Sequence, residues 1–478
     1  MTATAHVLVF PFPLQGHINC MLHFAAALVG AGVHVTFLHT DHNIRRVGCD
    51  SPAASPSPRL RFASVPDGLP EAHPRSVGDI MEVAVSLASA ASVAYRALLA
   101  RLPPVGDHRH GNDDVGVLPP VTCVVADGAL SWAIDVAEEV GVPALAFRTI
   151  SACGFLAYLS VPKLLELGEL PFPAGGDLDE PVRGVPGMES FLRRRDLPSS
   201  CRENMDVAQL IAELTAHSSK ARALILNTAA SLEPSALAHI KPRMHDVLLH
   251  AMSPSPAAAS SLWREDDGCL AWLDGKADRT VVYVSLGSLA VIFRDQFTEL
   301  FSGLVAAGYP FLWVHRPGMV AEASMDAVVQ EAVRAAAGCR GNARVVAWAP
   351  QRDVLRHRAV GCFLTHAGWN STLEAVVEGV PMVCWPFSAD QPINSRFVGA
   401  VWRTGLDIKD VCDRDVVERM VREAMESGEI RGLAQELAQQ VRLEITDGGS
   451  SSKELERLVS FIKKLSTLDK ESDQQNQG

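Results

Sequence analysis

Short apolar runs alternate with helix-length amphipathic stretches along almost the whole chain. The apolar runs are 6–10, 33–39, 122–126, 144–147 and 223–227 in the first half, and 280–285, 311–315, 344–348, 361–365 and 381–385 in the second half. A continuous apolar strand is typical of a parallel sheet that is covered by helices on both faces. The pattern therefore predicts an α/β fold with two doubly wound, Rossmann-like domains.

A stretch rich in Pro, Ser and Ala, SPSPAAASS at 253–261, separates the two series and has the composition of a linker. We therefore expect an N-terminal domain at 1–250, a linker at 251–262 and a C-terminal domain at 263–450. The last segment, 451–478, has the apolar spacing of a helix near its start and a polar end. We expect that helix to pack on the N-terminal domain and the tail to fray.

The charge and cysteine content exclude some classes of function. The chain has 43 basic and 55 acidic residues and a net charge of −12. An acidic chain repels phosphate on average, so we expect no nucleic-acid partner and no anionic membrane partner. The ten cysteines include no CxxC pair, and no Lys or Arg precedes Arg45. These features predict a cytoplasmic protein without a signal peptide, which we expect to be a monomer.

One segment, 81–100, is long and apolar enough to be considered as a membrane span. Glu82 and Arg96 lie near its two ends, and its apolar positions follow a helical period. We therefore expect a packed helix and no membrane span.

The segment from Trp348 to Gln391, called the donor box below, contains two turns that lead from a strand into a helix. Ligands of open parallel sheets bind at the carboxyl ends of the strands, where such turns lie. Asn370 and Ser371 begin a helix, whose first N–H groups and dipole attract an anion such as phosphate. His366 stands just before this helix and can add a charge-assisted contact.

Each of these residues also has an ordinary structural interpretation. Asn370 and Ser371 could be helix caps, His366 a core histidine and Trp348 a packing residue. Their combination, WAPQRDVLRHRAVGCFLTHAGWNSTLEAVVEGVPMVCWPFSADQ, resembles the signature box of plant family 1 UDP-dependent glycosyltransferases nearly position by position. The segment SLGS at 285–288 also resembles that family. The resemblance implies a fold of the GT-B type, in which two such domains face each other across a cleft.

The resemblance also implies which part of the UDP-sugar donor each matching residue binds. The parts are the uracil (Trp348 and Ala349), the ribose (Gln351 and Glu374), the diphosphate (Ser288, His366, Gly368, Asn370 and Ser371) and the sugar (Trp369, Asp390 and Gln391). In this family a Gln at the last position accompanies glucose and a His accompanies galactose. Gln391 therefore implies UDP-glucose as the donor substrate, with no cofactor and no metal.

In the N-terminal half, His17 follows the first apolar run and Asp127 ends the run 122–126. Both residues stand at carboxyl ends of parallel strands, where a His–Asp pair could form. Taken alone, His17 could be a structural loop residue and Asp127 a helix cap. The resemblance implies that His17, in a GHxxP-like loop, is the catalytic base and that Asp127, in DGALSW, is its partner. Cys20 stands where the family commonly has Pro.

Arg148 and Thr149 are candidates for the acceptor side, because they follow the strand after Asp127. Within the family, HTDHNIRR (39–46) and RTISACGF (148–155) resemble most the subgroup of 7-deoxyloganetic acid glucosyltransferases. The resemblance implies that Thr149 can contact the donor sugar. Many relatives carry an aromatic residue in place of Arg148, and we hypothesise that Arg148 pairs with an acceptor carboxylate or with a polar group of a terpenoid acceptor. The alternative is that Arg148 lies at the surface or makes a structural bond.

The expected activity is inverting transfer of glucose from UDP-glucose to a small hydrophobic metabolite, such as a terpenoid, a flavonoid or another phenolic. Alternatives are another UDP-sugar (galactose, xylose or glucuronic acid), a non-catalytic UDP-sugar-binding relative, and a nicotinamide-dependent oxidoreductase. The oxidoreductase would need a GxGxxG fingerprint, which the loop at His17 lacks. Two DxD motifs, 177–179 and 413–415, do not follow a strand of the kind that metal-dependent glycosyltransferases use, so we expect no metal.

Overall fold

The computed structural model describes residues 5–48, 57–75, 79–101, 119–173, 175–250, 261–321, 342–408, 412–446 and 448–475. The chain forms two compact units. Unit 1 comprises Met1–Phe155, Leu210–Leu262 and Glu444–Gly478, and unit 2 comprises Leu156–Gln209 and Trp263–Leu443. Residues 251–260 of the expected linker lie outside the described residues.

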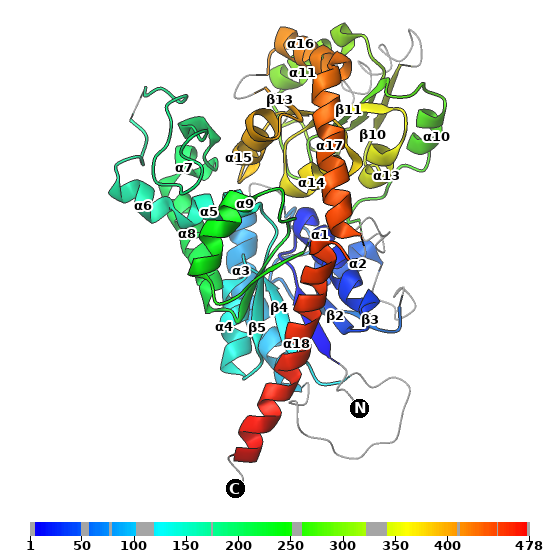
Figure 1. Cartoon of the computed structure of the whole chain (residues 1–478). Helices are drawn as coiled ribbons and strands as arrows, with labels where there is room; N and C mark the ends of the chain where they lie inside the picture. The colour runs from blue at the N-terminus through cyan, green and yellow to red at the C-terminus, as the bar shows by residue number, and fades with distance from the viewer. Residues whose placement is uncertain are drawn as a thin grey trace. The chain divides into compact units, whose positions relative to one another are not determined.

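Unit 1 is built on a seven-stranded parallel sheet with the order β3-β2-β1-β4-β5-β6-β7 (Figure 1). Its strands are β1 (His6–Phe10), β2 (His34–Thr40), β3 (Leu60–Val65), β4 (Cys123–Asp127), β5 (Ala144–Arg148), β6 (Ala223–Leu226) and β7 (Val247–Leu249). The strand order reverses between β1 and β4, which are hydrogen-bonded neighbours although β2 and β3 separate them along the chain. Such a reversal is the usual place for a ligand crevice at the carboxyl ends of the strands.

Helices cover both faces of this sheet. They are α1 (Gln15–Gly30), α2 (Asp41–Val47), α3 (Ile80–Arg101), α4 (Ser131–Glu139), α9 (Pro234–Ile240) and α18 (Ser450–Gln475), together with parts of α5 (Ala152–Leu159) and α8 (Met205–His217). Val7 and Val9 share a buried core with residues of α1 and α18. On the opposite face, Phe10 packs against Tyr95 of α3 and Trp132 of α4, with ring centroids 5.4 and 5.8 Å away.

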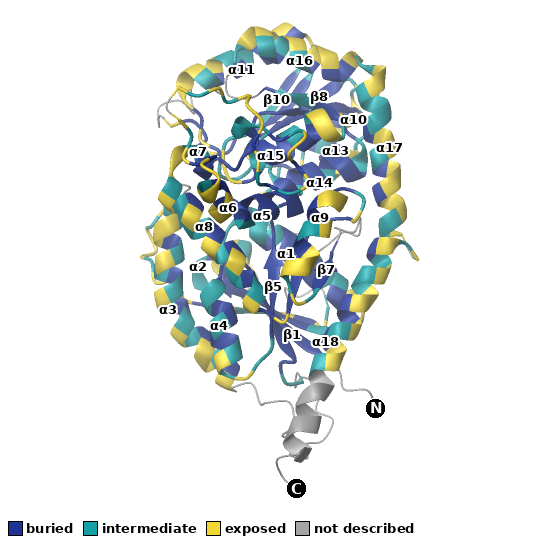
Figure 2. Cartoon of the chain, turned by 60° about the vertical axis from the view of Figure 1, so that its left-hand side comes forward, coloured by how far each residue is buried: buried dark blue, intermediate teal, exposed yellow. Residues whose placement is uncertain are grey.

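Helix α3 packs on unit 1 with one stripe of its surface. Its buried side chains are four residues apart: Val83, Leu87, Ala91, Tyr95 and Leu99. By length and composition alone, Ile80–Ala100 is apolar enough to cross a membrane, and Val85 and Val93 on its other side are exposed. Figure 2 shows the resulting alternation of buried and exposed residues along α3. The stripe fits the expectation of a helix packed on its own domain.

Unit 2 contains a second parallel sheet of six strands in the order β10-β9-β8-β11-β12-β13. The strands are β8 (Val281–Ser285), β9 (Phe311–Val314), β10 (Ala343–Val346), β11 (Val360–Thr365), β12 (Met382–Cys384) and β13 (Gly405–Asp407). This sheet also reverses its order, between β8 and β11. Each unit therefore has the doubly wound, Rossmann-like topology that the sequence predicts.

The helices of unit 2 form two layers. They are α6 (Val161–Glu166), α7 (Ser200–Glu203), α10 (Cys269–Asp274), α11 (Arg294–Ala307), α13 (Gln351–Arg356), α14 (Trp369–Glu378), α15 (Gln391–Arg396), α16 (Arg414–Glu426) and most of α17 (Gly428–Ile445). Val282 and Val284 of β8 share a core with residues of α11 and α16. The intervening residue Tyr283 faces the opposite layer, where its ring stacks on Phe363 and its hydroxyl reaches α13.

The boundaries of the two units differ from the expected domains. Residues 156–209 belong to unit 2, although the sequence interpretation placed them in the N-terminal domain. Hydrogen bonds within unit 2 explain the difference: Ser199 N–H donates to the Ala389 carbonyl (3.1 Å), and Arg396 Nε donates to the Phe191 carbonyl (2.9 Å). The last segment belongs to unit 1, where Leu458 and Ile462 of α18 enter the core.

All ten apolar runs form strands, and three further strands were missed. The missed strands are β3, β7 and β13, which lie at edges of the sheets. Four of the six residues of β3 are not fully buried, and β7 and β13 have only three residues each. An edge strand needs fewer apolar positions than a central strand, so its sequence signal is weaker.

His39 near the end of β2 generates a prediction about stability. Its ring is buried between Phe37 and Phe62, and neither ring nitrogen has a hydrogen-bond partner among the described residues. Burial lowers the pKa of His39 from 6.5 to about 4. Between these two pH values the unfolded chain binds more protons than the folded chain, so stability falls as the pH drops through this window.

We expect His39→Phe to raise the free energy of unfolding by about 1 kcal/mol at pH 7, because two unpaired buried nitrogens are removed. The gain should grow as the pH falls from 6.5 towards 4. Urea unfolding at several pH values measures both effects, with His245→Phe at an exposed position as the control. A gain that is the same at every pH would contradict this account of His39.

Candidate active site

The structure brings His17 and Asp127 together at the reversal of strand order in unit 1. His17 lies in the first turn of α1, directly after β1, and Asp127 is the last residue of β4. His17 Nδ1 donates to Asp127 Oδ2 over 2.6 Å. A carboxylate can only accept, so the proton sits on Nδ1 and the Nε2 lone pair is left to take a proton from a substrate.

Asp127 is held as a buried anion, with 2% of its side chain exposed. Its carboxylate also accepts hydrogen bonds from the N–H groups of Phe12 (3.2 Å) and Ala129 (2.9 Å). Burial alone raises the pKa of Asp127. The charge that His17 carries when protonated, the His17 hydrogen bond, the Ala129 N–H and the Arg148 charge together lower that pKa below its ordinary value. Asp127 is therefore ionised at neutral pH and can orient the His17 ring.

The two acceptor-side candidates lie next to this pair. Thr149 Oγ1 is 3.2 Å from His17 Nδ1, so Thr149 contacts the His17 ring, and its expected contact with the donor sugar stays a prediction. Arg148 is buried, and its Nη2 donates to Thr215 Oγ1 over 3.3 Å. Of the alternatives considered for Arg148, the structure thus shows a structural bond and no surface position. A bond to an acceptor carboxylate stays a prediction.

In unit 2, His366 follows β11 and lies against two glycines. A Cβ atom on Gly287 would come within 2.5 Å of His366 Nε2, and one on Gly368 within 2.4 Å. Only glycine leaves room for the ring at these two positions. Burial lowers the pKa of His366 to about 4, against a smaller opposing effect of the Ser285 backbone. At neutral pH the ring is therefore neutral, and its charge-assisted contact with a phosphate stays a prediction.

The two residues that were expected to bind ribose are joined to each other. Gln351 Nε2 donates to Glu374 Oε2 (2.7 Å) and to Ser371 Oγ (2.9 Å), and Gln351 Oε1 accepts from the Tyr283 hydroxyl (3.3 Å). Burial raises the pKa of Glu374, and the bond from Gln351 opposes that shift. This network orients the side chains of α13 and α14 before any ligand arrives.

The aromatic residues of the donor box have aromatic partners. Trp348 follows β10 and stacks on Trp263, with ring centroids 5.9 Å apart and planes 24° apart. The Trp348 carbonyl accepts from the Asp266 N–H (2.9 Å). Trp369 is buried at the start of α14, where it packs near Trp402, and Ala349 is buried next to Trp348.

Ser288 and the remaining predicted residues of the donor box lie in a turn after a strand or at the start of a helix. Ser288 lies in the turn after β8, Asn370 and Ser371 lie in the first turn of α14, and Asp390 and Gln391 lie at the start of α15. These turns follow β8, β11 and β12, which are adjacent strands of one sheet. The start of α14 can therefore offer N–H groups to an anion at this edge of the sheet.

Asp390 and Gln391 make bonds within their own loop. Gln391 Oε1 accepts from the N–H groups of Phe387 (2.8 Å) and Ser388 (3.0 Å). Asp390 is buried, and its Oδ2 accepts from Asn394 Nδ2 (3.1 Å). The expected contacts of these two side chains with a sugar therefore stay predictions.

Sequence reasoning missed two residues of this site, Trp263 and Asn394. Asn394 Nδ2 also donates to the Ala367 carbonyl (3.0 Å), which ties α15 to the turn that carries His366. Ala367 has a positive φ of 58°, so its strained turn is held in place by this bond. The spacing of four residues between Asp390 and Asn394 is a helical signal that could have indicated the pair. Nothing local in the sequence indicates that Trp263 stacks on Trp348.

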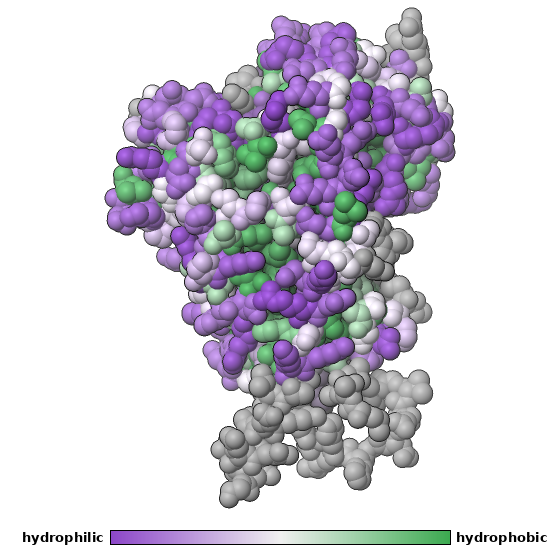
Figure 3. Space-filling model, in the orientation of Figure 1, coloured by the Kyte–Doolittle hydropathy of each residue, from purple (hydrophilic) through white to green (hydrophobic). Residues whose placement is uncertain are grey.

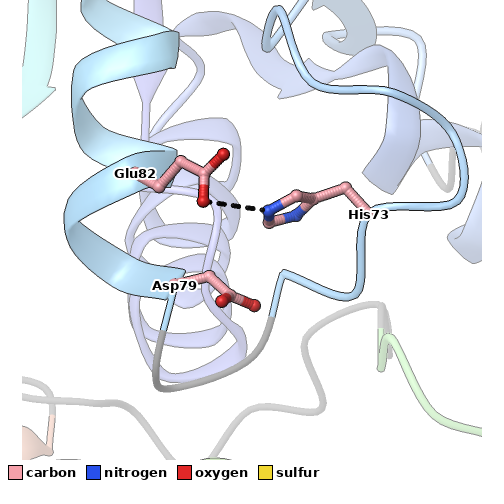
Figure 4. Close-up of side chains that lie close together, drawn as sticks. All are labelled: His73, Asp79 and Glu82. Carbon is pink, nitrogen blue, oxygen red and sulfur yellow. Dashed lines mark ion pairs between the residues drawn. The ribbon is translucent and has the colours of Figure 1, made fainter.

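The two DxD motifs are engaged in structural bonds. Asp179 accepts from Arg193 and Arg195 (2.8 Å each), and Asp413 caps α16 by accepting from the Asp415 N–H. Elsewhere in the described ranges, His73, Asp79 and Glu82 place potential metal ligands within 4.8 Å of one another (Figure 4). His73 Nε2 is 3.4 Å from Glu82 Oε2, and the Glu82 side chain is largely exposed. Among the described residues, we find no hydrogen bond or ion pair that joins the His73 or Glu82 side chain to His17 or to the donor box.

Most of the face of the chain drawn in Figure 3 is hydrophilic, and its apolar residues lie in small groups.

The two units offer different chemical groups. Unit 1 offers an oriented base, because Asp127 holds His17 with Nε2 unprotonated. Unit 2 offers donors for an anion and a half-buried indole for a flat ring.

Comparisons with known proteins find relatives that match nearly the whole chain. Residues 212–427 match the family model of UDP-glucoronosyl and UDP-glucosyl transferases. The chain is 40% identical to a 7-deoxyloganetic acid glucosyltransferase from Catharanthus roseus, covering 96% of this chain and 98% of the relative. It is 43% identical to a myricetin 3-O-rhamnoside 1,2-glucosyltransferase from Crocosmia x crocosmiiflora, covering 97% of each.

Solved structures show the same fold. A UDP-glucose:anthocyanidin 3-O-glucosyltransferase in complex with UDP has a TM-score of 0.80 at 24% identity, covering 97% of this chain and 100% of that one. Os79 from O. sativa in complex with UDP has a TM-score of 0.76 at 28% identity, covering 95% and 100%. The two parallel sheets of this chain are thus those of the GT-B structures.

The contact between Gly287 and His366 can be tested with a matched pair of glycines. Gly287 (φ +74°) and Gly308 (φ +79°) share a left-handed backbone, but a Cβ on Gly308 would meet nothing closer than 4.0 Å. Replacing either by Ala should cost about 1 kcal/mol of stability through backbone strain. Only Gly287→Ala should also displace His366 and weaken UDP binding, by about tenfold, through loss of one phosphate contact.

Calorimetric titration with UDP measures the affinity, and thermal unfolding measures the stability. An equal loss of UDP affinity in both variants would mean that backbone strain causes the loss, and that displacement of His366 does not.

Proposed function

This chain belongs to the family of UDP-dependent glycosyltransferases, and from that premise we propose that it transfers glucose from UDP-glucose to a hydroxyl or carboxyl group of a small hydrophobic metabolite. UDP-sugar glycosylation of small plant metabolites is the activity of the family. We further propose that the transfer inverts the anomeric centre and gives a β-glucoside. Membership of this family excludes the alternative of a nicotinamide-dependent oxidoreductase.

The observation that carries this proposal is the 2.6 Å bond between His17 Nδ1 and Asp127 Oδ2. His17 Nε2 takes the proton of the acceptor O–H while that oxygen attacks the anomeric carbon on the face opposite UDP. The new C–O bond forms as the bond from the sugar to the diphosphate breaks, and its electron pair leaves with UDP. Asp127 stabilises the imidazolium that forms, as the acidic member of a catalytic triad does.

The donor box accounts for the leaving group. Negative charge develops on the diphosphate as the sugar leaves, and donors already in place stabilise it without reorganisation. We assign this role to His366, Ser288 and the start of α14, with the uracil on Trp348 and the ribose at Gln351 and Glu374. His366 stands ready as a neutral donor because burial lowers its pKa.

Glucose is the proposed sugar for two reasons. Both relatives named above are glucosyltransferases by name, and Gln391 is the residue that accompanies glucose in the family resemblance. The names of these relatives include a terpenoid acid and a flavonoid glycoside as acceptors, which supports a hydrophobic hydroxylated acceptor for this chain. Galactose, xylose and glucuronic acid are the competing donor sugars.

We expect glucosides to form from UDP-glucose with members of a panel of phenols, flavonoids and terpenoid acids, detected by mass. UDP-galactose, UDP-xylose and UDP-glucuronic acid should react more slowly with the same acceptor, and the product should carry a β linkage by NMR. Faster transfer from another donor would replace glucose in the proposal. An α-linked product would contradict the single displacement.

We expect His17→Ala to lower the transfer rate by about 10³-fold, because the general base is lost. UDP binding, measured by ligand-induced stabilisation, should persist because the donor box is untouched. His217→Ala is the matched control. His217, the last residue of α8, also forms a His–Asp pair, with 2.9 Å between its Nε2 and Asp135 Oδ1. Turnover retained by His17→Ala would show that another group is the base.

A further inference from the structure

Arg148, the last residue of β5, is a charged side chain inside the core of unit 1. Only 6% of it is exposed. Its guanidinium lies over the ring of Phe155, with Cζ 5.4 Å from the ring centroid, and its Nη2 donates to Thr215 Oγ1. The Thr215 hydroxyl in turn donates to the Ile211 carbonyl over 2.6 Å. A buried cation is costly unless opposite charge compensates it, so the position of the nearest buried anion matters.

Asp127 is a buried anion whose chain neighbour Gly128 is in direct contact with the Arg148 side chain. A Cβ on Gly128 would lie 2.3 Å from Arg148 Cδ and 2.7 Å from Nη1. The Gly128 N–H donates to the Phe147 carbonyl (2.8 Å), which holds β4 and β5 together at this point. Gly128 thus provides the space that lets Arg148 pass close to the backbone beside Asp127.

Two titratable or charged side chains act on Asp127. They are His17 from α1 and Arg148 from β5, and the other contacts are the N–H groups of Phe12 and Ala129. Burial works against the Asp127 anion, and the Arg148 charge is one of the influences that offset it.

We infer that Arg148 is a positioning residue of the transfer reaction. Its buried positive charge keeps Asp127 ionised, and the ionised Asp127 holds His17 in the tautomer that can take the proton from the acceptor hydroxyl. The inference rests on the proposed function, in which His17 is the base. In this role Arg148 does not contact the substrate. It affects the reaction only through Asp127.

The sign of the effect on pH dependence follows from the charge. A positive charge beside the His17–Asp127 pair opposes the uptake of a further proton by the pair in acid. Removing that charge favours protonation, so the acid limb of the pH profile of kcat/KM moves to higher pH. A purely structural role for Arg148 would lower the rate without moving the limb.

The experiment compares Arg148→Met, which keeps length without charge, with Arg148→Lys, which keeps charge. The acid limb of Arg148→Met should move up by on the order of half a pH unit, and that of Arg148→Lys by less. KM for UDP-glucose should stay unchanged in both. An unmoved limb in Arg148→Met would overturn the inference, and so would equal shifts in the two variants.

Gly128→Ala gives an independent test that leaves Arg148 in the sequence. The added Cβ displaces the guanidinium, so the acid limb should shift in the same direction as in Arg148→Met. In an Arg148→Ala background the same substitution has nothing to displace, and its effect should vanish. Equal effects of Gly128→Ala in both backgrounds would overturn the inference, and this comparison also decides it should Arg148→Met fail to fold.

A carboxylic-acid acceptor and its methyl ester separate this role from a direct bond to the acceptor. If Arg148 bound an acceptor carboxylate, Arg148→Met would raise KM for the acid alone and would leave the limb unmoved with the ester, against the inference. Loss of activity in His17→Ala with an unmoved limb in Arg148→Met would reject only the role of Arg148. Turnover retained by His17→Ala would reject the proposed base and this inference with it.

Discussion

The reversal of strand order in each sheet is the constraint on which both groups of functional residues depend. Parallel pairing brings all carboxyl ends of the strands to one edge of a sheet. At β1 and β4, and again at β8 and β11, the chain leaves neighbouring strands in opposite directions. His17 and Asp127 in unit 1, and Gly287 and His366 in unit 2, lie at the ends of these strands or shortly after them. Residues far apart in sequence meet there because the topology leaves that edge open.

Burial then sets the charge state of each group. Asp127 stays an anion in a buried setting because His17, backbone N–H groups and Arg148 compensate it. Among the described residues, no carboxylate bonds to His366, and burial lowers its pKa so that the ring is neutral at pH 7. The same low dielectric environment thus keeps one residue charged and another neutral, according to what each one contacts. The proposed base and the proposed phosphate contact therefore start from different charge states.

The donor box is largely organised before a ligand binds. Gln351 joins Glu374, Ser371 and Tyr283, and Asn394 joins Asp390 to the strained turn at Ala367. Trp263 supports one side of Trp348. Binding groups that are already held lose less freedom when the donor arrives, which is the physical advantage of such networks.

The sequence by itself determined the ten apolar strands, the doubly wound fold and the donor box, because each of these is written in residues that are close together along the chain. It placed His17 and Asp127 at two strand ends, and the family resemblance implied that they form a pair. Only the tertiary structure decided that they bond, since 110 residues separate them. The burial of Arg148 against Gly128, its bond to Thr215 67 residues away, and the place of residues 156–209 in unit 2 were also decided there. Local patterns specify which segments become strands and helices, whereas these contacts arise only when distant segments pack against one another.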